Sequence, residues 1–177
     1  MLSRTLTGAE MRTLEPWQAA EFAAYTEAHR DELADTIPWA ETVVDEPTAR
    51  SFLQRYADGA ARDERRLYGL YVDGELVGGT LFRVFDLSCS TCEVGVWLSA
   101  DVRGRGLVTE AVQAMIDWAM DVRGMHRVEW RCSPDNTASS AVAKRLGMRL
   151  DGVLRESFPH RGRAEDVEVW ALLATER

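Results

Sequence analysis

The apolar residues of this chain recur with the period of a strand in some segments and with the period of a helix in others. Short runs rich in branched and aromatic residues predict strands over residues 10–14, 66–72, 75–85, 93–98, 126–132, 148–158 and 166–174. Apolar residues at three- and four-residue spacing predict helices over residues 15–29, 31–36, 46–59 (or as far as 63), 108–119 and 137–146.

The order of these elements predicts a mixed sheet. Asp73-Gly74 is a tight hairpin turn, because both positions tolerate positive φ, so the strands on either side should pair antiparallel. The second half of the chain contains a strand, helix, strand passage, which implies a parallel pair joined by a right-handed crossover. Gly78-Gly79 inside a strand predicts a bulge or a close approach of another segment. The predicted fold class is α/β (α+β), with three consecutive antiparallel strands before the crossover and helices on both faces.

A basic, glycine-rich turn, Arg103-Gly104-Arg105-Gly106, lies between the strand 93–98 and the long helix 108–119. Backbone N–H groups at a helix start lack intrahelical partners, and the helix dipole adds partial positive charge there. Glycines let an anion approach the backbone and arginines supply forked donors, so the turn is predicted to hold a phosphate. It lacks the Gly-Lys-Ser/Thr ending of a P-loop, and Thr109 stands where a dinucleotide fingerprint has its third glycine. From the turn alone, a solvated loop before a core helix is the alternative.

Arg103-Gly104-Arg105-Gly106-Leu107-Val108 resembles the Arg/Gln-x-x-Gly-x-Gly/Ala pyrophosphate motif of the GCN5-related N-acetyltransferases (GNAT), with Val108 replacing the final small residue. Thr109-Glu110-Ala111 resembles the RimJ/RimL-like branch, which acetylates N-terminal amines of ribosomal proteins. GVWL at 95–98, PDNTASSAVA at 134–143 and GVLRE at 152–156 also match in order and spacing. The resemblance covers nearly the whole chain. It implies a GNAT fold, with a mostly antiparallel sheet of about six to seven strands and a splayed parallel pair, and acetyl-CoA as cofactor.

The resemblance also assigns cofactor-binding residues. They are Val96, Leu98, Arg103, Gly104, Arg105, Gly106, Leu107, Val108, Thr109, Asn136, Ser139 and Lys144. Asn136 and Ser139 stand three apart on one helical turn and share a face. Asn136 is the expected N-cap, and the resemblance adds a hydrogen bond to the pantetheine arm, which runs beside strand 93–98. The Ser139 hydroxyl is expected to stabilise or protonate the departing thiolate.

The proton acceptor for the attacking amine is expected to be Glu93 or Glu156. A carboxylate that faces a partly dry cleft is suited to accept a proton, although each residue fits a solvated strand position equally well. Characterised relatives carry a glutamate two places after Glu156, where this chain has Phe158. Deprotonation relayed through water is therefore a further alternative.

The acceptor is expected to be a primary amine, and the branch resemblance favours the N-terminal α-amine of a protein. Trp39 and Glu41 lie in a segment that borders the acceptor site in this family, so both are expected to bind substrate. From the sequence alone, Trp39 fits a lid on the core better. A small-molecule amine such as an antibiotic or toxin, or transfer of succinyl in place of acetyl, are alternatives. A non-catalytic acyl-CoA-binding regulatory module is the alternative from another class, and binding of CoA without turnover would favour it.

Composition narrows the class of protein. The 177 residues, 46% hydrophobic and 28% charged, are expected to form a single domain over 1–177. A net charge of −8 argues against a nucleic-acid binder, and no apolar run predicts a membrane span or signal segment, so a cytoplasmic location is expected.

Three cysteines fit a reducing compartment. Cys89-x-x-Cys92 invites a zinc or redox interpretation, but without a second pair two incidental thiols and no metal are expected. A homodimer is expected from the family.

Overall fold

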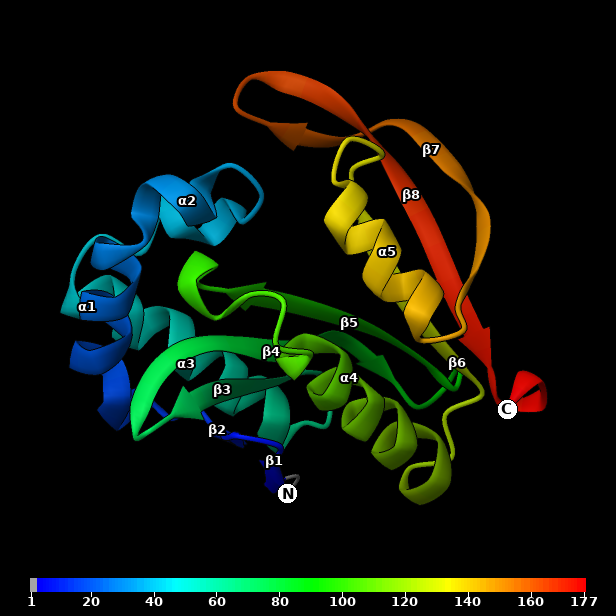
Figure 1. Ribbon diagram of the computed structural model, residues 1–177, viewed down its shortest axis with the longest axis horizontal. Helices are drawn as coiled ribbons and strands as arrows, with labels where there is room; N and C mark the ends of the chain where they lie inside the picture. Colours follow the sequence, from blue (N-terminus) through cyan, green and yellow to red (C-terminus); the bar gives the residue numbers. More distant parts are fainter. Residues whose placement is uncertain (1–2) are drawn as a thin grey trace.

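In the computed structural model, which describes residues 3–177, eight strands form one sheet in the order β1-β2-β3-β4-β5-β6-β8-β7 (Figure 1). The strands are β1 (Arg4–Leu6), β2 (Ala9–Thr13), β3 (Arg66–Val72), β4 (Glu75–Asp86), β5 (Thr91–Leu98), β6 (Arg127–Cys132), β7 (Arg149–His160) and β8 (Arg163–Leu173). Every neighbouring pair is antiparallel except β5 and β6, which are parallel. The predicted mixed sheet is confirmed, but the expected six to seven strands are corrected to eight. The strand that sequence missed is β1, whose three residues are too few to display a period.

The five predicted helices are present, with differences at their ends. They are α1 (Ala19–Ala28), α2 (Arg30–Ala34), α3 (Glu46–Ala61), α4 (Leu107–Asp117) and α5 (Thr137–Arg145). Short 3₁₀ turns occupy η1 (Pro16–Gln18), η2 (Pro38–Glu41), η3 (Ala100–Val102) and η5 (Ala174–Glu176), and η4 (Trp118–Val122) is a π-helical turn that extends α4. The segment predicted as a loop around Trp39 is therefore the 3₁₀ turn η2. Among the described residues, no helix is both long and apolar enough to cross a membrane.

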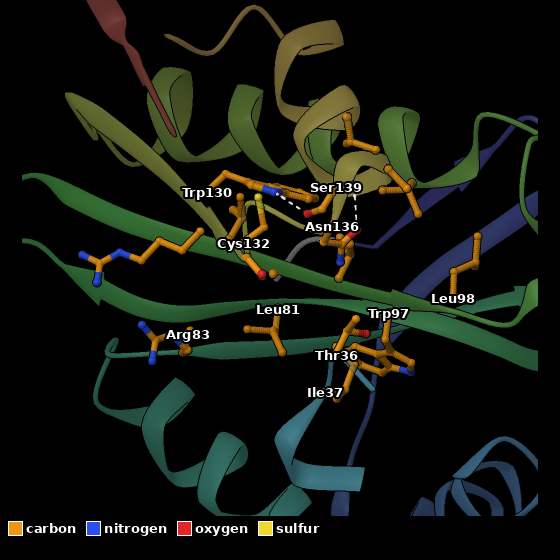
Figure 2. Close-up of a pocket in the computed structure, with 18 of the residues that line it drawn as sticks. Thr36, Ile37, Leu81, Arg83, Trp97, Leu98, Trp130, Cys132, Asn136 and Ser139 are labelled. Carbon is orange, nitrogen blue, oxygen red and sulfur yellow. Dashed lines mark hydrogen bonds between the residues drawn. The ribbon is translucent and has the colours of Figure 1, made fainter. Parts of the chain in front are cut away.

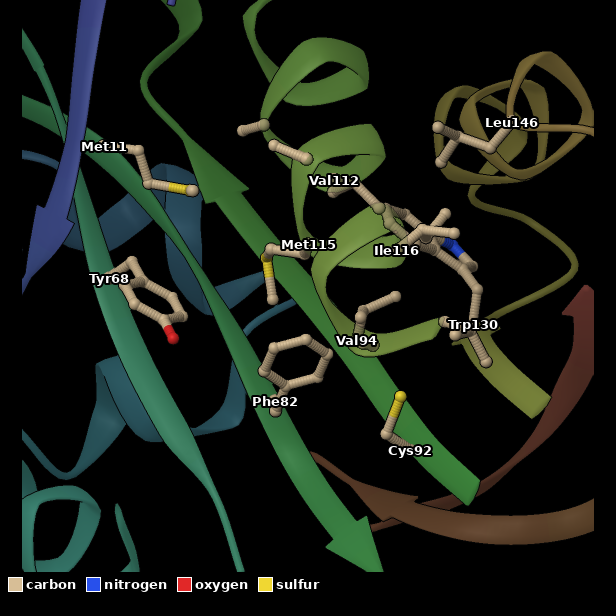
Figure 3. Packing of buried hydrophobic residues seen from close by; sticks show 14 of the residues in the cluster. Met11, Tyr68, Phe82, Cys92, Val94, Val112, Met115, Ile116, Trp130 and Leu146 are labelled. Carbon is tan, nitrogen blue, oxygen red and sulfur yellow. The ribbon is translucent and has the colours of Figure 1, made fainter. Parts of the chain in front are cut away.

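Apolar side chains form a core on each face of the sheet. On one face, Val112, Met115 and Ile116 of α4 pack with Phe82 and Val94 of the central strands (Figure 3). All five are buried, and burying such a side chain contributes roughly 1.5–3 kcal/mol. The apolar stripe predicted for the long helix is therefore confirmed as the surface that holds it on the sheet.

An aromatic cluster fills the other face, under α1 and α3. Phe22 of α1 stacks on Phe52 of α3 with ring centroids 5.5 Å apart. Trp39 of η2 lies 5.3 Å from Phe22 and 5.3 Å from Trp97 of β5. Aromatic contacts at these spacings fix the position of η2 against the central strand.

The parallel pair is splayed. Residues Thr91 to Val94 of β5 pair with Arg127 to Trp130 of β6, and the ladder ends there. Beyond this point β5 stays paired with β4 as far as Leu98, while β6 stays paired with β8 as far as Cys132. The last four residues of β5 therefore have no β6 partner on that edge, and their backbone groups can pair with an extended ligand.

The Gly78-Gly79 prediction is confirmed in both of its forms. Leu70 of β3 pairs with Gly78 and Tyr71 pairs with Leu76, so Val77 is an extra residue in β4. A Cβ atom on Gly79 would lie 2.2 Å from ring atoms of Trp97. Gly79 therefore leaves room for the Trp97 ring to pack closely against β4.

Candidate active site

A cavity of about 1780 Å³ lies where β5 and β6 separate. Its walls come from the end of β5, the turn before α4, the start of α5, the segment from α2 to η2 and the β7–β8 hairpin. Figure 2 shows Trp130, Asn136 and Ser139 on one side of it, with Leu81 and Arg83 of β4 and Trp97 of β5 on the other. Segments from both halves of the chain therefore meet at one site.

The glycine turn forms one end of this cavity. Gly104 and Gly106 have φ of +78° and +80°, a left-handed conformation that glycine adopts without strain, and a Cβ on either would meet nothing within 4 Å. Gly106 is the N-cap of α4 and no side chain caps this end, so the first N–H groups of an eleven-residue helix stay available to an anion. Arg105 donates to the carbonyl of Asp101 at 3.2 Å. The turn therefore has the uncapped helix start and the open backbone on which the prediction of an anion site depends.

Arg103 holds the turn against its surroundings. Its guanidinium donates to the carbonyl oxygen of Leu98 at 3.1 Å and forms an ion pair with Glu32 of α2. The side chain is 57% exposed, so this pairing is screened by solvent. All the residues assigned to the cofactor from 96 to 109 by the resemblance line the cavity: Val96, Leu98, Arg103, Gly104, Arg105, Gly106, Leu107, Val108 and Thr109.

Ser139 is held by two hydrogen bonds at the start of α5. Its backbone N–H donates to Oδ1 of Asn136 at 3.0 Å, which confirms Asn136 as the N-cap. Its Oγ accepts from the indole Nε1 of Trp130 at 2.9 Å (Figure 2). Because an indole nitrogen only donates, the Ser139 hydroxyl proton is left free to donate elsewhere. Both Asn136 and Ser139 line the cavity, and Trp130 is a supporting residue that the sequence analysis missed.

Glu93 lies in the cavity wall, but both of its oxygens are engaged. Arg83 donates from Nε to Oε1 at 2.6 Å and from Nη2 to Oε2 at 2.7 Å, and Arg131 lies 3.6 Å from Oε2. Hydrogen bonding to Glu93 raises the pKa of Arg83. Arg83 is the extra residue of a second bulge in β4, since Phe82 pairs with Val94 and Val84 pairs with Glu93. Sequence patterns did not indicate this pairing, because it depends on the bulge.

Glu156 does not lie among the residues that line the cavity. It is exposed, with φ of +49°, in the irregular stretch where the β7–β8 register shifts between Leu154 and Phe158. Its backbone N–H donates to Oδ1 of Asp166 at 2.8 Å. Phe158, in contrast, lies in the cavity wall directly across the ladder from Glu165.

The remaining assigned residues separate into one that lines the cavity and two that do not. Trp39 lies in the cavity wall and in the aromatic cluster, so the core and pocket interpretations both describe it. Glu41 accepts from Arg161 at 3.2 Å, outside the cavity wall. Lys144 lies with its Nζ 5.4 Å from the ring centroid of Trp170, also outside the wall.

The three cysteines differ in accessibility. Cys89 is exposed, Cys92 is buried in the core and Cys132 lines the cavity. Burial raises the pKa of Cys92 to about 12, so this thiol stays protonated. Within residues 3–177, no group of three or more histidine, cysteine or acidic side chains is arranged to hold a metal ion.

Comparison with known proteins places this site in a family. The sequence profile of the Acetyltransferase (GNAT) domain matches residues 12–149, well over half of the chain. The ribosomal-protein-serine acetyltransferase of Escherichia coli (strain K12) is 27% identical over 139 residues, 78% of each protein. The putative ribosomal N-acetyltransferase YdaF of Bacillus subtilis (strain 168) is 26% identical over 174 residues, 94% of this chain and 91% of that protein.

Solved structures have the same fold. RimL, a ribosomal alpha-N-protein acetyltransferase in complex with coenzyme A, has a TM-score of 0.92 at 21% identity and covers 98% of both chains. The microcin self immunity acetyltransferase MccE, in complex with acetyl-CoA and AMP, has a TM-score of 0.90 at 21% identity, covering 95% of this chain and 93% of that one. The splayed pair, the glycine turn and the profile match together define an N-acetyltransferase. The chain belongs to the GNAT acetyltransferase family.

Proposed function

We propose that this protein transfers the acetyl group of acetyl-CoA to the N-terminal α-amine of a protein, of the kind that ribosomal-protein acetyltransferases modify. The observation that carries the transfer is the anion-binding turn at the open end of the splayed β5–β6 pair. The named activity of the E. coli and RimL relatives supports the choice of acceptor.

An acyl-CoA would lie along the cavity, from the glycine turn to the unpaired edge of β5. The N–H groups at the start of α4 and the Arg105 side chain would hold the pyrophosphate, since Gly104 and Gly106 leave room for oxygens to reach the backbone. The unpaired edge of β5, from Gly95 to Leu98, offers backbone partners to the pantetheine arm. When bound, acetyl-CoA supplies an activated thioester. One of the N–H groups on this edge would polarise its carbonyl.

Ser139 would assist departure of the thiolate. Its oxygen already accepts from Trp130, so its proton is the part of the hydroxyl that can face a sulfur anion. Of the two carboxylates proposed as proton acceptor, Glu93 borders the cavity and Glu156 does not. Glu93 could accept a proton only at an oxygen that already accepts a hydrogen bond from Arg83.

A small-molecule amine is the second candidate acceptor. The L-methionine sulfoximine/L-methionine sulfone acetyltransferase of Pseudomonas aeruginosa is 27% identical over 139 residues, 75% of this chain. MccE belongs to the same fold and confers immunity to a microcin by its name. These relatives support testing free amino-acid analogues beside peptides.

The test is release of CoA thiol from acetyl-CoA with a panel of amines. The panel contains peptides with free N-terminal serine or alanine, the same peptides with blocked N-termini, methionine sulfoximine, an aminoglycoside and a polyamine. Turnover of the free peptides alone would support the proposal, while turnover of a small amine alone would replace the acceptor. No turnover with tight binding of acetyl-CoA would favour the non-catalytic module.

Two serine variants test the role of Ser139. Ser139→Ala should lower kcat by roughly 100-fold or more, as loss of a general acid does. Ser140→Ala is the matched control, because its hydroxyl donates to Glu168 at 2.7 Å and does not line the cavity. Equal losses in both variants would show that the effect of Ser139→Ala comes from the helix rather than from the hydroxyl.

A further inference from the structure

The tip of the β7–β8 hairpin carries a histidine–carboxylate pair in the wall of the cavity. His160, the last residue of β7, pairs with Arg163 across the turn and is 8% exposed. Its Nδ1 lies 3.2 Å from Oε1 of Glu165, and its Nε2 lies 3.2 Å from the carbonyl oxygen of Ala34 in α2. His160 and Glu165 both line the cavity. Figure 1 shows this end of the hairpin extending towards α2.

Both partners of His160 are hydrogen-bond acceptors, so neutral imidazole, with one N–H, can donate to only one of them. A carbonyl oxygen only accepts, so Nε2 must carry hydrogen in order to bond to Ala34. In neutral imidazole the other nitrogen is then an acceptor, and it faces the carboxylate of Glu165. Without a proton between them, the two acceptors face each other with lone pairs at 3.2 Å. A proton between Nδ1 and the carboxylate would let the ring donate to both of its partners.

The hairpin tip also carries Arg161 and Arg163, and Arg161 forms its ion pairs with other carboxylates. Arg161 is turned away from the pair and bonds to Asp35 at 2.7 Å and to Glu41 at 3.2 Å. Glu165 keeps 35% of its side chain exposed, so it can contact a substrate while His160 stays covered. Glu93 is less available to a substrate, because both of its oxygens accept hydrogen bonds from Arg83.

We propose that Glu165 is the catalytic residue that accepts the proton of the incoming ammonium, and that His160 is a positioning residue that takes up this proton behind it. This inference rests on the proposed acyl transfer. The ammonium gives one proton to a Glu165 oxygen, and the proton is shared with Nδ1 of His160. The neutral amine then attacks the thioester carbon, a C–N bond forms and the C–S bond breaks. The second nitrogen proton goes to the departing thiolate, so the products are an amide, CoA thiol and one proton for solvent.

The test compares pH profiles of kcat/KM for wild type, Glu165→Gln, His160→Gln and Glu93→Gln with a free N-terminal peptide. Glutamine keeps the size of each side chain, and at position 160 it keeps a donor for Ala34 but cannot titrate. Glu165→Gln should lower kcat/KM by roughly 100-fold or more, the usual effect of losing a general base. His160→Gln should abolish or shift the acidic limb of the profile, which a purely structural loss would not do. Acetyl-CoA affinity by calorimetry should stay unchanged in both.

The outcomes separate this inference from the proposed function. An active wild type, with Glu165→Gln at wild-type rate and an unaltered acidic limb in His160→Gln, would overturn the inference alone. Loss of the limb in Glu93→Gln instead would assign the proton to Glu93 and also overturn it. A wild type that turns over no amine would overturn the proposed function and this inference together.

Discussion

Gly79→Ala tests whether the close packing of β4 on Trp97 is needed for stability. The new Cβ would lie 2.2 Å from Cη2 and Cζ2 of Trp97 and 2.5 Å from the carbonyl oxygen of Tyr68. Ordinary contact begins near 3.4 Å, so the indole must retreat by roughly 1 Å. Trp97 is 3% exposed and packed against Trp39, and the Tyr68 oxygen belongs to the backbone of β3, so neither can give way freely.

Overpacking of this kind costs about 1–3 kcal/mol. Replacing glycine by alanine in a strand returns about 0.5–1 kcal/mol, so the expected net loss is about 1 kcal/mol and at most about 2.5 kcal/mol. In a chain of this size a loss of about 1 kcal/mol lowers Tm by about 2–4 °C. Urea unfolding and thermal scans measure it, provided that the m-value is unchanged.

Gly95→Ala in the neighbouring strand is the control for Gly79→Ala. Its Cβ would approach only the flexible side chain of Leu81, at 3.3 Å and 3.5 Å, so its stability should stay within about 0.5 kcal/mol of wild type. The reasoning fails if Gly79→Ala is as stable as wild type. It also fails if both variants lose the same free energy, because the loss would then reflect strand glycines in general.

Two further predictions concern titration and thiol reactivity. Burial raises the pKa of all four tyrosines, to about 12 in three of them. The native protein should therefore show no phenolate absorbance step near pH 10, and it should lose stability between pH 10 and 12, where only unfolded chains ionise. An absorbance step near pH 10 in the folded protein would contradict this. Exposed Cys89 should react with a thiol reagent at once, and buried Cys92 should react only after unfolding. Bound CoA should slow the reaction of Cys132, which lies in the cavity wall. Simultaneous reaction of all three thiols would refute these positions.

The fold was predictable where a pattern is local. The hairpin at Asp73-Gly74, the stripe on the long helix and the strand–helix–strand order each reside in one short segment, and the structure has them all. β1 was not predictable, because three residues at the sheet edge show no period. The bulge at Arg83 was also hidden, since it exists only in the register between β4 and β5.

In the candidate site, too, the features that depend on a local pattern were predictable and those that depend on distant contacts were not. The glycine turn and the Asn136 cap are encoded by residue type and order, so the motif was sufficient to locate them. Which partner each carboxylate in the cavity wall takes was not encoded locally. Arg83 reaches Glu93 across a ladder, and His160 reaches Glu165 across a hairpin and Ala34 from a helix 126 residues away in sequence. No period or spacing in the sequence reports such pairs.

Trp130 shows that the core and the chemistry of this protein depend on the same side chain. Opposite Val94, it is the last β6 residue paired with β5, so the cleft opens just beyond it, and its ring is 2% exposed in the core under α4. A buried indole N–H without a partner would cost about 1–3 kcal/mol, and Ser139 supplies that partner. The orientation of the serine hydroxyl is therefore fixed by the folding of the core, before any substrate binds. For the same reason Ser139→Ala removes both the proposed proton donor and the acceptor for Trp130, so its activity must be interpreted beside its stability.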